Sequence, residues 1–299
     1  MAAPAARHWQ DLPPLGAPAS PWLHEEVARR MAQRLEWIVT RPKRWAHWFA
    51  LRGGLEGHAL VQQRYADAGF DVVEATPERA AAARAALEAP WWSPRRWGVG
   101  ASAPRFLAAT EALPAQRSVD MLWANMALHA AADPQALIAQ WQQALAVDGF
   151  LMFSCFGPDT LRELHRVYAE LGWPPAGHAF TDMHDWGDML VHAGFAEPVM
   201  DMERIVLTYD SPERLLAELR EIGRNLHPGR FPALRGRRFR ERLLQVLAER
   251  LASPAEDGRL VLTFEIVYGH AFKPLPKARL AAESAVGLED MRRMLRGKR

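Results

Sequence analysis

Short apolar runs alternate with amphipathic stretches along most of this chain. Two apolar runs, 118–129 and 149–156, are separated by a stretch with helical spacing that opens at Asp133. Strand, helix and strand at this spacing predict a βαβ unit, from which parallel sheets are built. Ligands of such open sheets bind beyond the carboxyl ends of the strands, where Asn125 and Cys155 fall. We therefore expect a small-molecule site at this edge of an α/β sheet.

The pattern before this unit predicts a leader, three helices and two strands. Residues 1–21, rich in proline and alanine, are expected to form a flexible leader. The elements expected next are a helix over 23–38, a strand over 44–51, a loop over 52–57, a helix to about 65, a strand over 70–73 that ends at Glu74, and a helix over 77–87 capped by Thr76. No strand is predicted over 90–104, which is dense in tryptophan, proline and arginine.

The second half of the chain continues the alternation. Thr160 and Glu163 are spaced as a capping box and predict a helix start there. Further helices are expected over 184–193, 212–224 and 236–251, and strands over 199–209 and 259–271. The fold class is therefore α/β, with a mostly parallel sheet that ends in antiparallel strands.

Composition narrows the class of protein. The 299 residues carry a net charge of only +2, which argues against a dedicated nucleic-acid binder. The single cysteine, Cys155, excludes an intramolecular disulfide and is typical of a reducing compartment. No apolar run is long enough to span a membrane, and the N-terminus lacks an apolar signal core. We therefore expect a cytoplasmic protein.

A glycine-containing loop follows the first predicted strand. Gly53, Gly54 and Gly57 would let backbone amides approach a ligand, although their spacing does not match G-x-G-x-x-G. Glu74, at the end of the next strand, stands where a carboxylate accepts hydrogen bonds from both hydroxyls of a ribose. Together they suggest a nucleoside cofactor; a plain strand-to-helix turn is the alternative.

Further polar positions flank the later strands. Glu111, Ala112 and Leu113 form a turn whose backbone amides could contact an adenine edge, and Asn125 could hold the amino-acid end of a cofactor. The alternatives are an exposed turn for Glu111 and a strand-end cap for Asn125. The acidic cluster around Asp182 is interpreted as a helix cap, so no metal site is predicted.

The chain resembles class I S-adenosylmethionine-dependent methyltransferases, and within them the malonyl-[acyl-carrier protein] O-methyltransferases of biotin synthesis. The resemblance is close over about 118–274 and loose over 23–114. It rests on the segments Asp120–His129, Phe156–Leu164, Thr181–Asp188, Ala193–Phe195, Pro198–Glu203, Leu207–Tyr209 and Tyr268–Pro274, and on Glu111–Pro114. It implies a Rossmann-like methyltransferase domain over 22–274, a helical lid inserted at about 211–255, and a basic tail or helix over 275–299.

The resemblance also implies a cofactor, a reaction and a partner. S-adenosylmethionine would donate a methyl group to the free carboxylate of a malonyl thioester on acyl-carrier protein, which masks its charge. That carboxylate is already ionised at neutral pH, so no general base is needed and no catalytic residue is assigned. His129 and Arg162 are candidates to bind the substrate; a surface or structural role is the alternative for each. A basic stretch is a candidate docking surface for the acidic carrier protein, with a solvated helix face as the alternative: Arg230, Arg235, Arg237, Arg238, Arg240 and Arg242.

The sequence departs from the family at its first motif, an acidic residue followed by Gly-Cys-Gly-x-Gly. Leu51 or Arg52 stands near the expected acid. Ala109 or Thr110 replaces the acid that usually precedes Glu111. Two other functions therefore stay open: a non-catalytic relative, similar to the methyltransferase-like factors of respiratory complex I assembly, and a methyltransferase for another small acid or a protein side chain. The methyltransferase prediction requires that the first loop leave room for a sulfonium nucleoside above Glu74.

Overall fold

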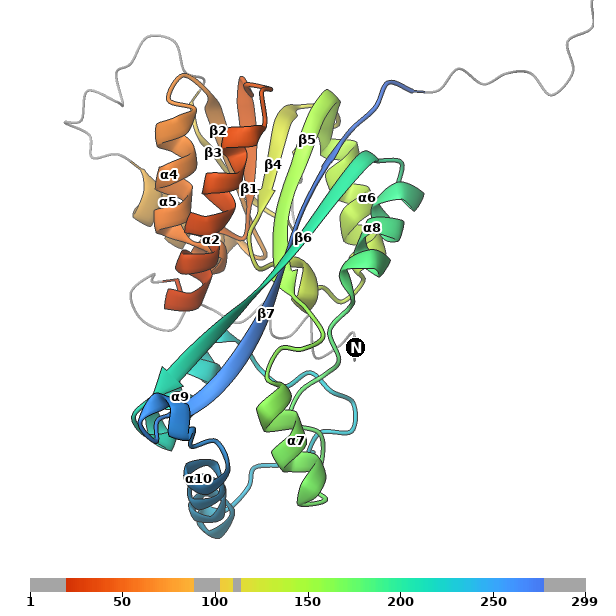
Figure 1. Cartoon of the computed structure of the whole chain (residues 1–299). Coiled ribbons are helices and arrows are strands. Elements are labelled where there is room, and N and C mark those ends of the chain that lie inside the picture. The colour runs from red at the N-terminus through yellow and green to blue at the C-terminus, as the bar shows by residue number, and fades with distance from the viewer. Residues whose placement is uncertain (1–19, 89–102, 110–113, 277–299) are drawn as a thin grey trace, which may run out of the picture.

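The protein is built on one twisted sheet. The computed structural model describes residues 20–88, 103–109 and 114–276, and within them seven strands pair in the order β3-β2-β1-β4-β5-β7-β6 (Figure 1). The strand β7 pairs antiparallel with both of its neighbours, β5 and β6, while the other strand pairs described are parallel. The strands are β1 (Arg44–Trp48), β2 (Gly69–Glu74), β3 (Arg105–Ala108), β4 (Val119–Ala124), β5 (Leu145–Phe156), β6 (Ala196–Tyr209) and β7 (Leu260–Phe272). The predicted mostly parallel sheet with an antiparallel C-terminal strand is confirmed.

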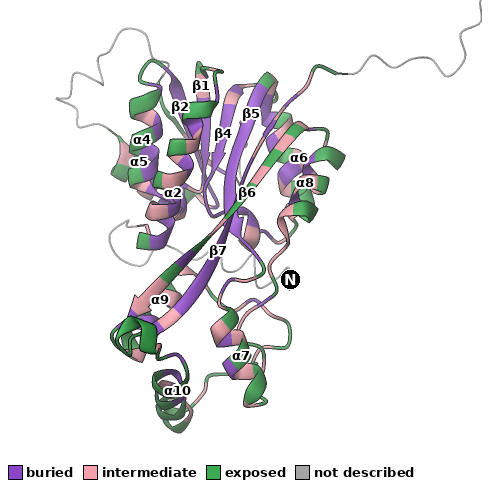
Figure 2. Ribbon diagram, viewed as in Figure 1, coloured by how far each residue is buried: buried purple, intermediate pink, exposed green. Residues whose placement is uncertain are grey.

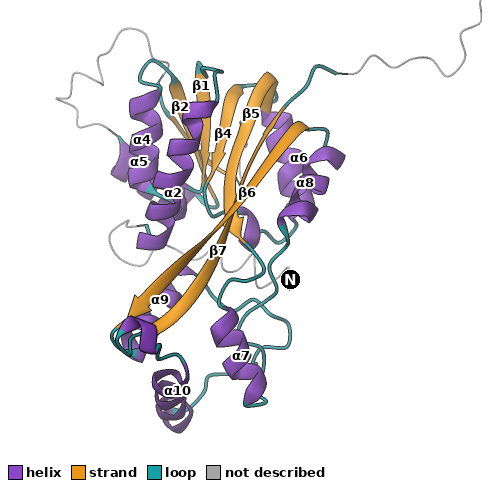
Figure 3. Ribbon diagram, viewed as in Figure 1, coloured by secondary structure: helices purple, strands orange, loops and turns teal. Residues whose placement is uncertain are grey.

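Helices cover both faces of the sheet (Figure 3). One face is covered by α2 (Trp22–Arg34), α4 (Leu55–Arg64) and α5 (Pro77–Leu87), and the other by α6 (Pro134–Ala144) and α8 (Met183–His192). The helix α3 (Ala50–Gly53) lies between β1 and α4, and α7 (Arg162–Glu170) follows β5. The helices α9 (Pro212–Ile222) and α10 (Arg237–Arg250) lie between β6 and β7.

The sheet separates two apolar cores (Figure 2). Trp45 and Met121 point to the α2 side, while Trp48 and Leu122 point to the α6 side. Successive strand residues alternate between the faces, so a strand buried on both sides is apolar throughout. This explains why the central strands appear in the sequence as continuous apolar runs.

Three of the predicted helix starts are confirmed by their caps. The Thr76 hydroxyl accepts a hydrogen bond from the Arg79 amide, at 3.4 Å. The carboxylate of Asp133 accepts from the Ala136 amide at 2.9 Å, and that of Asp182 accepts from the His184 amide at 2.8 Å. Such caps satisfy backbone donors that the first turn of a helix leaves unpaired. The structural interpretation of Asp182 is therefore confirmed.

The predicted capping box is wrong. The hydroxyl of Thr160 bonds to the backbone of Glu265, and the carboxylate of Glu163 accepts hydrogen bonds from the amide and hydroxyl of Thr263. Both side chains therefore attach the start of α7 to β7, while Leu161, with φ of 60°, is the N-terminal cap residue. The sequence spacing could not distinguish a local cap from these contacts, which join residues about 100 positions apart.

Two strand predictions need correction. The first strand was expected over 44–51, but β1 ends at Trp48 and Phe49 turns into the left-handed region, with φ of 60°. The chain then forms α3 where a loop was expected. The strand β3 was not predicted; it pairs with β2 at the sheet edge.

The inserted helices stand at one end of the molecule. The strands β6 and β7 extend beyond the parallel part of the sheet, and α9 and α10 lie at their far end (Figure 1). The predicted insertion therefore exists, while its role as a lid and the domain limits at 22 and 274 stay predictions. The predicted leader and tail lie almost wholly outside the described residues. No described helix combines the length and apolarity that a bilayer crossing requires.

Candidate functional site

The carboxyl ends of the central strands meet at one edge of the sheet. Phe49 follows β1, Glu74 ends β2, Asn125 follows β4 and Phe156 ends β5. Phe49 and its counterpart after β4, Met126, have φ of 60° and 53°. Left-handed backbone is costly for bulky residues and gathers at functional sites. The topology thus brings Glu74 and Asn125 to the edge where the sequence predicted a ligand.

Glu74 is fully buried and bonded to the chain itself. One carboxylate oxygen accepts a hydrogen bond from the Leu51 amide at 2.8 Å, and the other accepts from Nε of Arg79 at 3.1 Å. Burial raises the pKa of Glu74, and the charge of Arg79 opposes that shift. The carboxylate therefore stabilises the turn after β1 in the described conformation.

Asn125 is likewise saturated by internal hydrogen bonds. Its amide nitrogen donates to the carbonyl of His24 at 2.8 Å and also to the carbonyl of Gly53. Its side-chain oxygen accepts from the hydroxyl of Ser154 at 2.6 Å. The Asn125 side chain therefore joins α2, α3 and β5. This role is close to that of a strand-end cap, the alternative that the sequence left open.

The glycines permit close packing within the chain. A Cβ on Gly53 would lie 2.8 Å from the carbonyl oxygen of Asn125, and a Cβ on Gly57 would lie 2.4 Å from Cβ of Ala28. A Cβ on Gly54, whose φ is 118°, would lie 2.8 Å from the Glu25 carboxylate. Each glycine is therefore required by a protein contact at this edge.

Glu25 occupies the N-terminus of α4. Its carboxylate accepts hydrogen bonds from the amides of Leu55 at 2.7 Å, Glu56 at 3.2 Å and Gly57 at 3.0 Å. A helix N-terminus favours anions because its first amides are unpaired and its dipole is positive there. In this chain the anion is a side chain of α2.

Arg52 lies in the space between the strand ends and α9. It lines a cavity of about 30 Å³ together with His24, Phe49, Asn125, Met126, Ala127, His129, Ala130 and Ile222. Its carbonyl contacts Nδ1 of His24 at 2.7 Å, and its guanidinium donates to the carbonyl of Glu221 at 3.4 Å. Burial lowers the pKa of Arg52 to about 9, and the positive charges of Arg79 and Arg224 act in the same direction.

The residues at this edge do not fit an S-adenosyl nucleoside in the described conformation. The cavity beside Asn125 holds about one water molecule, whereas small-molecule sites usually measure roughly 300–1,000 Å³. Glu74 and Asn125 are both bonded to the chain itself. Gly53, Gly54, Gly57, Glu74 and Asn125 are thus together as predicted, while their cofactor role stays a prediction.

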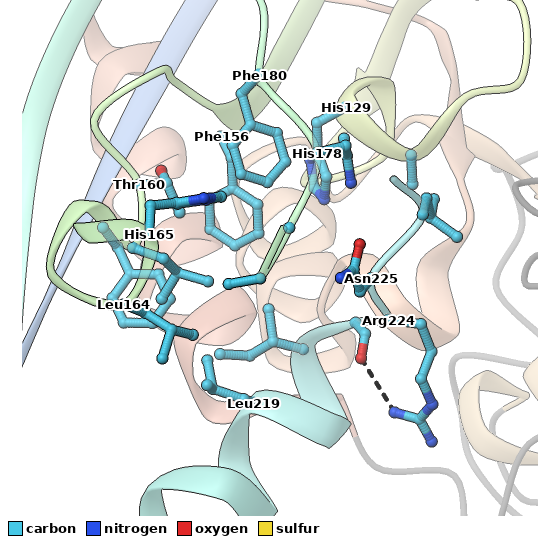
Figure 4. A pocket seen from close by; sticks show the side chains of 18 of the residues that line it. His129, Phe156, Thr160, Leu164, His165, His178, Phe180, Leu219, Arg224 and Asn225 are labelled. Carbon is cyan, nitrogen blue, oxygen red and sulfur yellow. Dashed lines mark hydrogen bonds between the residues drawn. The ribbon is translucent and has the colours of Figure 1, made fainter. Parts of the chain in front are cut away.

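A larger cavity of about 260 Å³ lies beside this edge (Figure 4). It is enclosed by the loop after β4, the end of β5, the start of α7, the segment 176–180 and the C-terminal half of α9. Apolar side chains form most of its wall: Phe156, Leu161, Leu164, Phe180, Leu216, Leu219, Ile222 and Phe264. His129, Ala130 and Ile222 line both cavities, so these three residues lie between the two spaces.

Three histidines bring nitrogen atoms to the larger cavity. His129, His165 and His178 line it, and His178 lies beside His129 in Figure 4. Burial lowers the pKa of all three imidazoles, most strongly that of His129, where His24 and His178 add to the shift. These rings are therefore neutral at pH 7, when each has one donor and one acceptor nitrogen. They can donate hydrogen bonds within an apolar wall.

The two predicted substrate residues end in different places. His129 lines the cavity. Arg162 is about half exposed, and its guanidinium points to Glu163 at 3.2 Å and Asp159 at 3.6 Å, so it is not brought to this wall. Glu111, Ala112 and Leu113 lie outside the described residues.

Sequence reasoning missed two residues of this region, Glu25 and His178. The bulk of Arg52 in the glycine loop is visible in the sequence, and Arg52 does line the space that a nucleoside would need. The acidic first turn of α2 was a visible signal for Glu25, but its partner α4 lies 30 residues away in the chain. His178 sits in a segment without helix or strand, where periodicity gives no signal.

Comparisons with known proteins identify relatives of this chain. No family model matches the chain. It is 41% identical over 260 residues to the malonyl-[acyl-carrier protein] O-methyltransferase of Laribacter hongkongensis, which covers 86% of this chain and 84% of that protein. It is 38% identical over 269 residues to the protein of the same name from Gallionella capsiferriformans, which covers 88% of each chain.

A solved structure has the same fold. The YcgJ protein of Bacillus subtilis superimposes with a TM-score of 0.51, and the match covers 84% of this chain and 99% of that one. At 15% identity, this similarity concerns the arrangement of helices and strands alone.

Proposed function

Because the chain belongs to the malonyl-[acyl-carrier protein] O-methyltransferase family, we propose that it transfers a methyl group from S-adenosylmethionine to the free carboxylate of a malonyl thioester on acyl-carrier protein. The ester would mask the negative charge, so that fatty-acid enzymes can extend the chain toward a biotin precursor. The acceptor is ionised at neutral pH, so positioning and exclusion of water are what the protein has to supply.

The observation that carries this proposal is the larger cavity at the carboxyl edge of the sheet. It is apolar over most of its wall and is lined in part by α9, which suits a short acyl chain. His129 lines both this cavity and the smaller one, so it stands between the places proposed for the acceptor and the donor.

His129 and His178 are the proposed partners of the acceptor carboxylate. A carboxylate in an apolar cavity requires hydrogen-bond donors, because an unpaired buried charge is costly. His129 Nδ1 and both ring nitrogens of His178 are buried with no hydrogen bond of ordinary geometry among the described residues, and the His129 backbone interacts with the His178 ring. Asn225 lines the same wall, and its amide nitrogen donates a hydrogen bond to the carbonyl of Pro175 at 2.7 Å.

Carrier-protein docking is proposed for the arginine stretch. Arg237, Arg238, Arg240 and Arg242 are exposed on α10. Arg230 and Arg235 lie on the preceding segment and are partly buried; Arg235 stacks 3.8 Å from the ring centroid of Phe239. Clustered positive charge attracts an acidic partner and accelerates its association at low salt.

The test is methyl transfer to malonyl-acyl-carrier protein, with the methyl ester detected by mass spectrometry, together with rescue of a biotin auxotroph that lacks its own methyltransferase. We expect the ester and growth from the wild type. A His178→Ala variant should lose at least tenfold in kcat/KM, and His178→Gln, which keeps a donor, should lose less. Absence of both ester and growth would refute the proposal.

Docking is tested separately by charge reversal. Arg237→Glu, Arg238→Glu and Arg240→Glu together should raise KM for the carrier protein at low salt and leave kcat within twofold. The matched control reverses three other exposed arginines, Arg29, Arg41 and Arg84. Equal KM values for both triple variants would reject this surface.

A second candidate function is supported by the internal hydrogen bonds at the edge. Because Glu74, Asn125 and the first amides of α4 are all bonded within the chain, a non-catalytic relative that binds the same carrier protein is the alternative. Carrier-protein binding by a chain that forms no methyl ester would favour it.

We propose a cytoplasmic location as well. The sole cysteine, Cys155, is a buried free thiol whose pKa is raised by burial, which is consistent with a reducing compartment.

A further inference from the structure

We infer that residues 49–57 hold the cofactor position closed through Arg52 and Glu25, and that an S-adenosyl ligand enters only when Arg52 leaves the space above Glu74. The inference rests on the proposed function, because it concerns the donor position of that reaction. It also proposes that the contact between Arg52 and α9 regulates binding of the cofactor.

The first observation is the place of Arg52. It stands after β1, on the segment that passes over Glu74, and its atoms help to reduce the remaining cavity to about 30 Å³. The backbone carbonyl of Arg52 contacts His24, and its guanidinium contacts the carbonyl of Glu221. The side chain therefore bridges the sheet edge and α9.

The second observation is the electrostatic setting of this guanidinium. Its pKa is lowered mainly by burial and further by the nearby charges of Arg79 and Arg224, with Glu74 in partial compensation. Arginine stays protonated in proteins, so Arg52 carries a positive charge at this place. A sulfonium ligand is also a cation, and Arg52 in its present position opposes its entry.

The third observation is Glu25. Its carboxylate accepts hydrogen bonds from three amides at the start of α4, which is the anion position that this turn offers. The carboxylate of an amino-acid ligand would have to compete with it. The Glu25 side chain therefore takes the place of the ligand's carboxylate, and the Arg52 side chain takes the place of its sulfonium.

The fourth observation connects the two cavities. Ile222, at the end of α9, lines both of them, and the neighbouring carbonyl of Glu221 is an acceptor of Arg52. A thioester that fills the larger cavity and moves α9 would weaken this contact. The acyl-carrier substrate should therefore increase affinity for the cofactor, and by linkage the cofactor should increase affinity for the substrate.

Isothermal titration with S-adenosylhomocysteine tests the inference without any turnover. The Arg52→Ala variant should bind this ligand at least tenfold more tightly than the wild type. Arg84→Ala, on the exposed side of α5, is the matched control and should bind as the wild type does. Equal affinities of wild type and Arg52→Ala, including failure of both to bind, would overturn the inference.

Two further measurements cover a folding defect and the role of Glu25. Arg52→Met keeps the apolar stem and removes the charge, so it should fold as the wild type does and bind S-adenosylhomocysteine more tightly than the wild type; equal binding would again count against the inference. Glu25→Gln combined with Arg52→Ala should tighten binding further.

In hydrogen exchange, peptides over 49–57 should exchange faster in Arg52→Ala, and unchanged exchange would contradict a closing role.

The inference and the proposed function can fail independently. If Arg52→Ala binds the ligand more tightly but neither protein forms a methyl ester, the closing contact stands and methyl transfer does not. If the wild type forms the ester and binds the ligand as tightly as Arg52→Ala does, methyl transfer stands and the closing contact does not.

Discussion

The carboxylate of Glu74 and the guanidinium of Arg79 form a buried ion pair, with 3.1 Å between Oε2 and Nε. Glu74 ends β2, and Arg79 stands in the first turn of α5, five residues later. The backbone amide of Leu51, in the turn after β1, donates a hydrogen bond to the other oxygen of this carboxylate. The pair therefore joins three elements at the functional edge of the sheet.

Arg79→Ala should destabilise the protein by about 3–5 kcal/mol, because it leaves a buried carboxylate without its charged partner. Urea unfolding at pH 7 measures the change. Arg84→Ala on the same helix, where the side chain is 53% exposed, should cost less than about 1 kcal/mol. Similar losses for the two variants would contradict the importance of the buried pair.

Two glycines in helices should respond in opposite directions to alanine. In α4, Gly57→Ala would place Cβ 2.4 Å from Cβ of Ala28, and overpacking of this kind costs about 1–3 kcal/mol. In α8, Gly187→Ala meets nothing closer than 3.7 Å and should stabilise the protein by about 0.5–1 kcal/mol through helix propensity. Thermal unfolding of both variants checks the signs, and a stabilising Gly57→Ala would show that α2 and α4 can separate without loss.

Glu163→Ala should destabilise the protein by about 1–3 kcal/mol, because it leaves the buried amide and hydroxyl of Thr263 without their acceptor. The neighbouring variant Arg162→Ala removes an exposed side chain and should cost less than about 1 kcal/mol. Chemical unfolding compares the two. The reverse order would mean that α7 is held mainly by surface ion pairs.

Buried histidines should make the protein sensitive to mild acid. Burial lowers the pKa of His24 to about 4 and that of His58 to about 3, while an unfolded histidine has a pKa of about 6.5. Below pH 6.5 the unfolded chain binds protons that the folded chain does not, so stability falls as the pH falls toward these values. Between pH 7 and pH 5 each of the two should cost about 2 kcal/mol of unfolding free energy.

The variant His58→Phe isolates one of these contributions. His58 packs against Trp45 and Phe70, with ring centroids 4.7 Å away in each case, so a phenyl ring keeps this packing but removes the hydrogen bond between Nδ1 of His58 and Nδ1 of His47. The variant should lose about 2 kcal/mol less than the wild type between pH 7 and pH 5. Val61→Ala, on the same helix, is destabilising without titration and should keep the dependence of the wild type. If the stability of His58→Phe depended on pH as that of the wild type does, His58 would not contribute to the acid sensitivity.

The sequence determined the architecture of this protein. Apolar runs such as 149–156 and capped amphipathic stretches such as the one after Asp133 are local signals, because strand and helix periodicities are set by backbone geometry. They sufficed for the α/β class and the antiparallel end of the sheet, while the family was identified from the resemblance of motifs over about 118–274. They also placed Glu74 and Asn125 at the correct edge, since strand ends follow from the same pattern.

Only the tertiary structure decided what these residues bind. Glu25 and the amide of Leu55, or Glu163 and Thr263, are 30 and 100 residues apart, and no local pattern encodes which carboxylate meets which donor. The glycines after β1 look like a ligand loop in the sequence, yet packing against α2 and Asn125 explains each of them. Hydrogen-bond partners are chosen when the elements pack, because a buried polar group takes whichever partner the fold brings to it.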